Sequence, residues 1–384
     1  PPPTQAPKFT NPVPQPHTTG MSTLRKICTT CDIRSSVWYL AANDWRQTMK
    51  FGKIAQYLVL TAICASLAVV YLAGTGAQAD RNTQTHESLH SKLNRASVEI
   101  LINGRMTGSG AFVSPDGLVL TACHVLKNSK GKQIEVISPT VGRMTARQIA
   151  IDPGHDLALL QVSGKKQQYP YLNVAPDTPA ALSKVLLPCG PIWRHGLILS
   201  GSIARTKPSY CWQSSLKCYT RCIYIDGASP VGSSGGCWTD SHGRIISVQS
   251  GYLNNADKAW VGIAFACPTD AIHKLIARKT DRELATLGAT VDELWTQSQG
   301  FIARLPKGAQ GIVTPRIQKG GPSEQAGLTS ETLIMEIDGK PVAYLEDLLD
   351  IVQSKKPGDE VTLKVIEPIG KPARLVKVRL GKVN

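Results

Sequence analysis

A serine set between glycines, in the stretch Gly232-Ser233-Ser234-Gly235-Gly236, constrains this chain more than any other feature. A serine hydroxyl is a weak nucleophile at neutral pH. It needs a base to accept its proton and donors to hold the oxyanion that forms on the substrate. Glycines on both sides allow a tight turn that exposes the hydroxyl and aims backbone N–H groups at one point. Gly-Ser turns are also common structural features, so this stretch alone leaves both interpretations open.

Two upstream segments favour the catalytic interpretation. His124 lies in a small-residue turn after the apolar run 118–120, and Asp156 stands at the mouth of the apolar run 157–162. An isolated histidine of this kind is more often a buried side chain bonded to backbone, and a turn aspartate often satisfies nearby N–H groups. Asp152, which precedes a proline, suits that structural role. The order His, Asp, Ser instead predicts a nucleophile, its base and the residue that orients the base.

Ordered matches from Gly108 to the C-terminus resemble the HtrA/Deg family of trypsin-type serine proteases, with a PDZ domain after the protease. In the protease part the matching segments are residues 108–110, 121–125, 156–160, 200–203, 225–236, 240–246 and 262–268. The resemblance implies a mostly β fold, with a chymotrypsin-like double β-barrel followed by a PDZ domain of α+β type.

The resemblance also implies a role for each matching site residue. Ser234 is the expected nucleophile, His124 the general base and then acid, and Asp156 the group that fixes the histidine tautomer. The backbone N–H groups of Gly232, Ser233 and Ser234 are the expected oxyanion donors, and losing one such donor typically costs ~3 kcal/mol of transition-state stabilisation. Ser233 stands where the family has asparagine, which leaves the resting conformation of this loop open.

The primary substrate pocket is expected six residues before the nucleophile in a trypsin-type fold. Ala228 occupies that floor position, and the expected walls are Val248, Gln249, Ser250 and Ala264. No acidic residue falls at the floor, so specificity for Lys or Arg is not expected. We predict cleavage after small or medium aliphatic residues such as Val, Ala or Leu.

The formal net charge of +15 could indicate a nucleic-acid or membrane-surface partner. Lys and Arg are scattered, however, without a basic block or interleaved aromatics, so we expect a solvated basic surface and no nucleic-acid binding. Of ten cysteines, seven lie between Cys123 and Cys267; outside the cytosol some could form disulfides, of unreadable connectivity. Cys28 and Cys31 form a C-x-x-C without a second ligand pair, so we expect no metal and no cofactor.

The N-terminal part predicts a membrane or export segment. Residues 1–52 read as a disordered, cytoplasmic extension, and residues 53–79 as a hydrophobic helix. This helix is either a transmembrane anchor or a signal peptide ending at Ala77-Gln78-Ala79. Lys50 and Lys53 precede the segment, which puts the N-terminus in the cytoplasm and the protease outside it, either membrane-anchored or periplasmic. Residues 80–92 are polar and read as a linker.

The rest of the chain divides into a protease domain (93–268), a helical linker (269–297) and a PDZ domain (298–384). Helical spacing of apolar residues supports the linker assignment: Ala271, Ile272, Leu275 and Ile276, then Leu284, Leu287 and Leu294. The PDZ resemblance rests on residues 311–314, 320–328 and 333–342, with an expected helix at 345–352 and strand at 361–365. Its expected carboxylate-binding loop consists of Phe301, Ile302, Ala303 and Arg304, whose N–H groups would hold a peptide C-terminus as the peptide adds a strand.

These expectations combine into an extracytoplasmic serine endopeptidase that cleaves misfolded or regulatory proteins, with a PDZ domain that recognises peptide C-termini. The family resemblance implies a homotrimer. The altered loop before Ser234 keeps a second hypothesis open, in which the barrels are catalytically inactive and the chain is a PDZ binding or scaffold protein. A serine esterase is disfavoured, because esterases place histidine last in the chain order, whereas here it comes first.

Overall fold

The computed structural model describes residues 65–66, 88–164, 168–191, 194–254, 260–366 and 372–383. Asn82–Asn384 group into one unit by their contacts. The predicted extension (1–52) and hydrophobic helix (53–79) lie outside the described residues, apart from residues 65–66. Within the described ranges, no helix is both long enough and apolar enough to cross a membrane.

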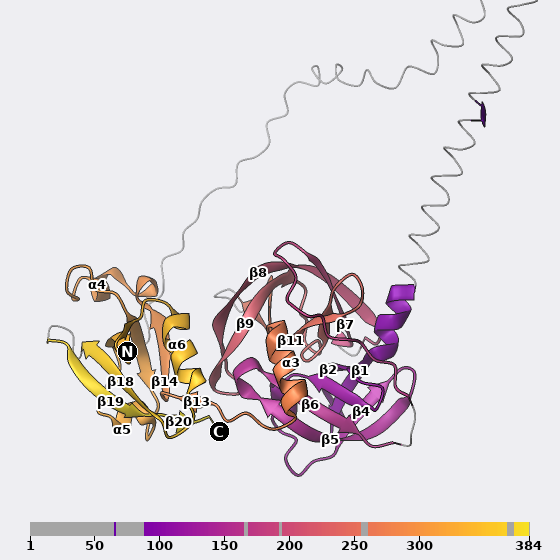
Figure 1. Cartoon of the computed structure of the whole chain (residues 1–384), viewed down its shortest axis with the longest axis horizontal. Helices are drawn as coiled ribbons and strands as arrows, with labels where there is room; N and C mark the ends of the chain where they lie inside the picture. Colours follow the sequence, from indigo (N-terminus) through magenta and orange to yellow (C-terminus); the bar gives the residue numbers. More distant parts are fainter. Residues whose placement is uncertain are drawn as a thin grey trace, which may run out of the picture. The chain divides into compact units, whose positions relative to one another are not determined.

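The first β-barrel closes in the strand order β1-β2-β3-β6-β5-β4 (Figure 1). Its strands are β1 (Ser97–Ile102), β2 (Arg105–Phe112), β3 (Leu118–Thr121), β4 (Ile134–Ser138), β5 (Gly142–Asp152) and β6 (Leu157–Val162). Asn103 and Gly104, both with positive φ, make the two-residue turn between β1 and β2, a turn whose twist matches that of antiparallel strands. The apolar runs noted in the sequence become β3 and β6, which pair with each other and are buried along almost their whole length.

The second β-barrel closes in the order β10-β11-β12-β9-β8-β7. Its strands are β7 (Lys184–Cys189), β8 (Leu197–Gln213), β9 (Cys218–Gly227), β10 (Cys237–Thr239), β11 (Ile245–Asn254) and β12 (Trp260–Ala266). Trp238 is fully buried in its core together with Ile203 and Ile223. The two barrels that the resemblance implied are therefore present, and the long β8–β9 hairpin extends from the second of them.

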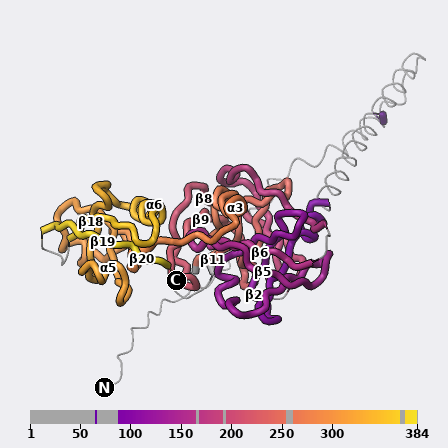
Figure 2. Tube along the Cα trace, turned by 60° about the horizontal axis from the view of Figure 1, so that its bottom comes forward, coloured from indigo at the N-terminus to yellow at the C-terminus, as the bar shows by residue number. Residues whose placement is uncertain are grey.

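Two helices pack on the barrels. Residues 88–96 are helical and Leu93 is fully buried in the first-barrel core, so residues 88–92 of the predicted linker (80–92) form part of a helix. The second helix, α3 (Thr269–Arg278), follows β12 and buries Ala271, Ile272 and Leu275 against the barrels. Figure 2 shows the path of the chain through α3. The helical spacing seen in the sequence thus holds for this first part of the linker.

The rest of the predicted helical linker is wrong. The α3 helix ends at Lys279, which adopts a left-handed conformation with φ 52°. The chain then forms β13 (Ala285–Thr286), β14 (Ala289–Glu293) and a short 3-10 turn, η4 (Leu294–Thr296). Strand β14 pairs with β15, and this ladder, made with residues distant in sequence, overrides the weak helical spacing of the leucines.

The C-terminal sheet has the order β14-β15-β16-β18-β19, with β17 paired to β16 and β13 paired to β20. The remaining elements are β15 (Ile312–Ile317), β16 (Thr332–Ile337), β17 (Lys340–Pro341), β18 (Glu360–Ile366), β19 (Arg374–Arg379), β20 (Gly381–Lys382), α4 (Gln299–Ile302), α5 (Pro322–Gln325) and α6 (Leu345–Ser354). Elements α6 and β18 confirm the predicted helix and strand. Leu348 of α6 and Leu363 of β18 are fully buried in one core.

Candidate active site

The histidine and the aspartate of the predicted triad are brought together by strand pairing. His124 lies in the 3-10 turn η1 (Cys123–Leu126), directly after β3, and Asp156 directly precedes β6. Because β3 pairs with β6 and Thr121 lies opposite Ala158, the two site residues emerge at the same end of one ladder. His124 Nδ1 lies 2.7 Å from Asp156 Oδ2, and the His124 amide donates to Oδ1 at 2.8 Å.

The Asp156 side chain also contacts two donors, Ser250 and Gln213, that were not predicted from the sequence to bind it. The left-handed backbone of Asp156 (φ 53°) follows the short turn η2 (Pro153–His155). The Ser250 hydroxyl donates to Asp156 Oδ2 at 2.5 Å, and the Gln213 amide approaches the same oxygen at 3.4 Å. Ser250 was predicted as a wall of the substrate pocket, whereas its hydroxyl is here engaged by this carboxylate. No local sequence pattern indicates either contact, because both donors come from the second barrel.

The environment of His124 suits a general base. Burial disfavours the charged imidazole and by itself would lower its pKa. The negative charge of Asp156 and the hydrogen bond to it outweigh burial, so the pKa of His124 is raised above its ordinary value. With Nδ1 hydrogen-bonded to the carboxylate, Nε2 is the nitrogen left to accept a proton from a nucleophile.

The role of Asp152 is structural, but the prediction that it satisfies N–H groups of its turn is wrong, because its side chain makes no capping hydrogen bond there. Its buried carboxylate accepts hydrogen bonds from Arg282 at 3.3 Å and pairs with the His155 ring at 3.1 Å. Burial alone would raise its pKa, but His155 and Arg282 outweigh this and hold the pKa at about 2. This carboxylate therefore serves an ion-pair network beside the site.

The serine turn packs against the histidine turn. A methyl group on Gly235, whose φ is +81°, would lie 2.2 Å from Thr121 Oγ1 and 2.3 Å from the Ser109 carbonyl oxygen. A methyl group on Gly108 would lie 2.6 Å from both the Ser234 carbonyl oxygen and Val125 Cγ2. These contacts leave no room for a Cβ at either position, and they set Ser234 beside the segment that carries His124.

Ser109 makes two hydrogen bonds to this turn and one to Gly190. Its amide donates to the Ser234 carbonyl oxygen at 2.7 Å, and its hydroxyl donates to the Gly232 carbonyl oxygen at 2.8 Å. The same hydroxyl accepts from the Gly190 amide at 3.2 Å. Ser109 is fully buried. The sequence showed this residue only as part of a family-like motif, and its role in holding the nucleophile turn is evident only from these contacts.

The three predicted oxyanion donors differ in whether a local turn already uses the backbone amide. The Ser233 amide donates to the Pro230 carbonyl oxygen at 3.0 Å, and the Ser233 hydroxyl donates to the same oxygen at 2.7 Å. Ser233 therefore closes a local turn, and the expectation that its amide binds an oxyanion is wrong for this conformation. Gly232, with φ 96°, and Ser234 are the two predicted donors whose amides are not spent in that turn.

The other predicted pocket residues lie on, or directly beside, strands of the second barrel. Val248 and Ala264 are fully buried on β11 and β12, and Ala228, just beyond β9, is half-buried. The Gln249 side chain is held at both ends, since its Oε1 accepts from Trp238 Nε1 at 2.7 Å and its Nε2 donates to the Gly251 carbonyl oxygen at 2.6 Å. Both ends of the Gln249 side chain are thus fixed by hydrogen bonds within the barrel.

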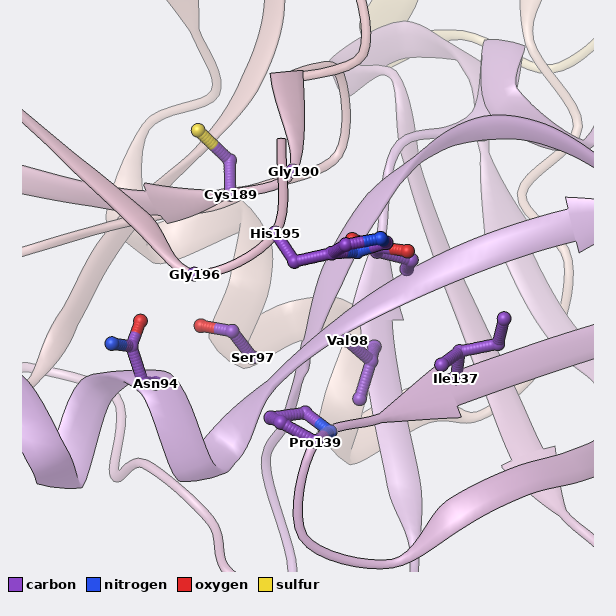
Figure 3. Close-up of a pocket in the computed structure, with 10 residues that line it drawn as sticks. Asn94, Ser97, Val98, Ile137, Pro139, Cys189, Gly190, His195 and Gly196 are labelled. Atoms are coloured by element: carbon purple, nitrogen blue, oxygen red, sulfur yellow. The ribbon is translucent and has the colours of Figure 1, made fainter. Parts of the chain in front are cut away.

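A cavity of about 280 Å³ lies where both barrels meet the helix 88–96 (Figure 3). It is lined by Asn94, Ser97, Val98, Glu99, Ile137, Pro139, Cys189, Gly190, His195 and Gly196. Glu99 is almost fully buried and hydrogen-bonds the exposed His195 ring. The wall residue Gly190 donates to Ser109, so this cavity is joined to the nucleophile turn through a single hydroxyl.

The predicted carboxylate-binding loop of the PDZ domain is wrong. Residues 299–302 form the helix α4, and the amides of Phe301, Ile302, Ala303 and Arg304 all donate to backbone carbonyl oxygens within that turn. They are therefore not available to a peptide carboxylate. The sheet edge that could accept a peptide strand is β14, where the Tyr219 hydroxyl donates to the Val291 carbonyl oxygen and accepts from the Val291 amide, both at 2.8 Å.

The fold and site define a class: a double-barrel, trypsin-like protease chain with a PDZ domain. A family model of the trypsin-like peptidase domain matches residues 108–248, and one of the PDZ domain matches residues 285–371. The chain therefore combines a trypsin-like peptidase domain with a PDZ domain, and its similarity to DegP-like and HtrA-type proteases agrees with the family that its sequence resembles. The PDZ match starts at β13, in agreement with the strands found before residue 298.

Curated relatives and solved structures give the same assignment. The chain is similar to proteins described as "Probable periplasmic serine endoprotease DegP-like". The Bartonella henselae protein is 26% identical over 67% of this chain and 50% of that protein, and the Chlamydia trachomatis protein is 27% identical over 67% and 51%. The chain spans about half the length of the curated relatives it matches.

Two solved structures share the fold. "HtrA-type protease AlgW with decapeptide" has a TM-score of 0.56 and 20% identity, covering 77% of this chain and 97% of that one. "Crystal structure of the serine endoprotease from Yersinia pestis" has a TM-score of 0.54 and 20% identity, covering 78% and 98%.

Proposed function

We propose that the chain is a serine endopeptidase in which Ser234 attacks the scissile carbonyl and forms an acyl-enzyme. His124 takes the serine proton as base and returns it to the leaving amine as acid, while Asp156 orients the ring and stabilises its charged form. The amides of Gly232 and Ser234 would hold the oxyanion. The observation that carries the proposal is the 2.7 Å contact between His124 Nδ1 and Asp156 Oδ2, beside a serine turn that tolerates no Cβ at Gly235.

The decisive experiment compares the chain with its Ser234→Ala variant on unfolded casein. The proposal expects hydrolysis that is lost in the variant by several orders of magnitude, because the nucleophile is removed. Asp152→Asn is a matched control, since it alters a neighbouring carboxylate that the mechanism does not use. Equal rates in the chain and the Ser234→Ala variant would refute Ser234 as nucleophile.

The second candidate is a protease-like chain that binds partners without cutting them. The observation that favours it is the Ser233 turn, which differs from the family and ties one predicted oxyanion donor to Pro230. This candidate predicts no hydrolysis by the wild-type chain, together with undiminished binding of unfolded protein by both forms. Casein hydrolysis that depends on Ser234 would exclude it.

We propose that the substrate pocket, with Ala228 at its floor and Ala264 in its wall, accepts Val, Ala or Leu before the cleaved bond. Neither predicted position carries a charge that could pair with Lys or Arg. A library of peptides that differ only at the residue before the cut tests this. Preferential cleavage after basic residues would show that the pocket has been placed wrongly.

We further propose that the PDZ domain binds peptide C-termini along the free edge of β14, with Leu349 and Val352 of α6 facing the same hollow as Leu287 and Val291. A peptide that adds a strand there must replace the two hydrogen bonds that Tyr219 makes to Val291. The similar protease AlgW was solved with a decapeptide, which supports peptide binding here. Titration with a C-terminal decapeptide and with its amidated form would test recognition of the carboxylate.

We also propose that the chain acts outside the cytoplasm, on unfolded or regulatory proteins, as a homotrimer, with residues 53–79 as anchor or cleaved signal. The periplasmic description of the relatives supports the location. N-terminal sequencing of the mature protein distinguishes the two fates of residues 53–79. Light scattering coupled to size-exclusion chromatography measures the oligomeric state.

A further inference from the structure

Two cysteines face each other across the β8–β9 hairpin. Cys211 lies on β8 opposite Thr220, and Cys222 lies on β9 opposite Ser209. Residues two apart along a strand point to the same face, so Cys222 shares a face with Thr220 and therefore with Cys211. The two thiols are therefore diagonal neighbours on the same face of one ladder, close enough for long side chains to interact.

The side chains already point toward each other. Cys211 Sγ lies 2.9 Å from Cys222 Sγ and 3.7 Å from the Tyr224 hydroxyl oxygen. Cys222 is almost fully buried, whereas Cys211 is partly exposed. Arg205 lies over the Tyr224 ring on the same strand pair. Cys211 is therefore the more accessible residue of the pair, and the Cys222 thiol lies in contact with it.

Reactivity differs among the cysteines of the described residues. The hydrogen bond from Cys222 outweighs burial and, helped by the Tyr224 hydroxyl and the charge of Arg205, lowers the pKa of Cys211. Burial raises the pKa of the other thiols. It holds the pKa of Cys189, Cys218 and Cys267 at about 12, and it raises the pKa of Cys123 and Cys237 further still. Because the thiolate is the reactive form, Cys211 is the thiol expected to react first.

We propose that Cys211 and Cys222 are a redox modification site that takes up a disulfide bond from a small disulfide oxidant such as oxidised glutathione. The Cys211 thiolate attacks one sulfur of the oxidant, forms a mixed disulfide and expels one thiolate of the oxidant. The Cys222 thiolate then attacks Cys211 Sγ and expels the second. Overall, two protein thiols lose two electrons and two protons and become one disulfide, while the oxidant disulfide is reduced to two thiols.

The disulfide lies close in sequence to a residue at the end of the hairpin that contacts the candidate active site. Gln213 ends β8, two residues after Cys211, and its amide approaches both Asp156 Oδ2 at 3.4 Å and Ser250 Oγ at 3.3 Å. A covalent tie between β8 and β9 fixes the base of the segment that makes these contacts. The bond closes a short loop, from 211 to 222, and removes unfolded-state freedom that the reduced hairpin retains.

The test uses the full chain incubated with oxidised glutathione, then blocked with an alkylating reagent, digested without reductant and analysed by mass spectrometry. We expect one peptide pair that joins Cys211 to Cys222, with Cys189 recovered in its alkylated form. We also expect the oxidised chain to melt about 5 to 10 °C above the reduced chain. The matched control Cys189→Ser must form the same linked pair.

Two single variants test the order of attack. In Cys222→Ser, Cys211 is left with the mixed disulfide and is recovered as a glutathione adduct. In Cys211→Ser, Cys222 loses the hydrogen bond with Cys211 that contributes most to its raised pKa, but it stays buried, so it is recovered without the adduct. Full alkylation of Cys211 after oxidation of the wild-type chain, or its linkage to a cysteine other than Cys222, would overturn the proposal. An unchanged melting temperature on formation of the linked pair would overturn its stabilising role.

Discussion

Replacing Ser109 by alanine tests whether the nucleophile turn depends on a hydroxyl that belongs to none of the triad residues. In the structure this hydroxyl is the only group that joins the Gly190 amide to the Gly232 carbonyl oxygen, among the hydrogen bonds of the described residues. The substitution removes both bonds and leaves the two backbone groups in a buried site. The triad side chains keep their own contacts, since none of them bonds to the Ser109 hydroxyl.

The expected effect has two parts. Two hydrogen bonds at about 1 kcal/mol each, with buried groups left unsatisfied, lower the free energy of unfolding by about 2 to 3 kcal/mol. For a domain of this size that is a fall in Tm of about 4 to 10 °C. Loss of one oxyanion donor typically costs about 10²- to 10³-fold in kcat. Loosening Gly232 without deleting its amide should therefore cost less, about 10- to 100-fold.

The assay is casein or peptide hydrolysis, with kcat and KM determined separately, beside a thermal melt. Ser323→Ala is the matched control, because Ser323 is also a buried serine whose hydroxyl donates to a carbonyl oxygen, that of Leu287, at 2.7 Å. Both variants should lose stability, but only Ser109→Ala should lose kcat, with KM changed by less than about threefold. If Ser109→Ala melts lower yet retains full kcat, the hydroxyl is merely structural and the reasoning fails.

Three further outcomes are expected. Gly235→Ala should reduce kcat/KM by at least about 100-fold, because its Cβ would overlap Thr121, while Gly131→Ala, at a position with the same backbone sign and open space, should retain activity in the same assay. The rate should rise with pH through an inflection above about 6.5, because His124 must be neutral to act as base and its pKa is raised. Removing the carboxylate in Asp156→Asn should move that inflection to lower pH. An inflection that does not move would belong to another group. Tyr219→Phe removes both hydrogen bonds to the edge of β14 and should tighten binding of a C-terminal peptide by about 30-fold in a fluorescence titration, since each neutral hydrogen bond is worth about 1 kcal/mol. Weaker binding would show that the hydroxyl assists the peptide.

The sequence predicted those parts of the molecule that rest on local pattern. Apolar runs ending in small-residue turns located β3 and β6, and the helical spacing of Ala271, Ile272 and Leu275 located α3. The predicted helix and strand of the PDZ domain correspond to α6 and β18. In each case the pattern and the element occupy the same few residues, so no distant partner is needed to specify the structure.

One error falls where strand partners distant in sequence decide the structure. Residues 285–286 and 289–293 form strands because β13 and β14 pair with β20 and β15, although Leu284, Leu287 and Leu294 in this region are spaced as in a helix. Other errors have a local cause: the sequence from Phe301 to Arg304 resembles a carboxylate-binding loop, but the amides of these residues donate to carbonyl oxygens within a helical turn. Ser233 lost its predicted role for the same reason, since a turn to Pro230 claims its amide.

The amino-acid sequence alone determined the class of fold and the identity of the chemical groups in the site, because these follow from the order, spacing and type of the residues. Only the folded molecule decided which groups meet. Ser250 and Gln213 reach Asp156, Ser109 reaches Gly232, and Cys211 reaches Cys222, each across strands that close the barrels. Such contacts depend on the pairing register of separate strands, and a shift of one residue would turn every one of these side chains to the opposite face.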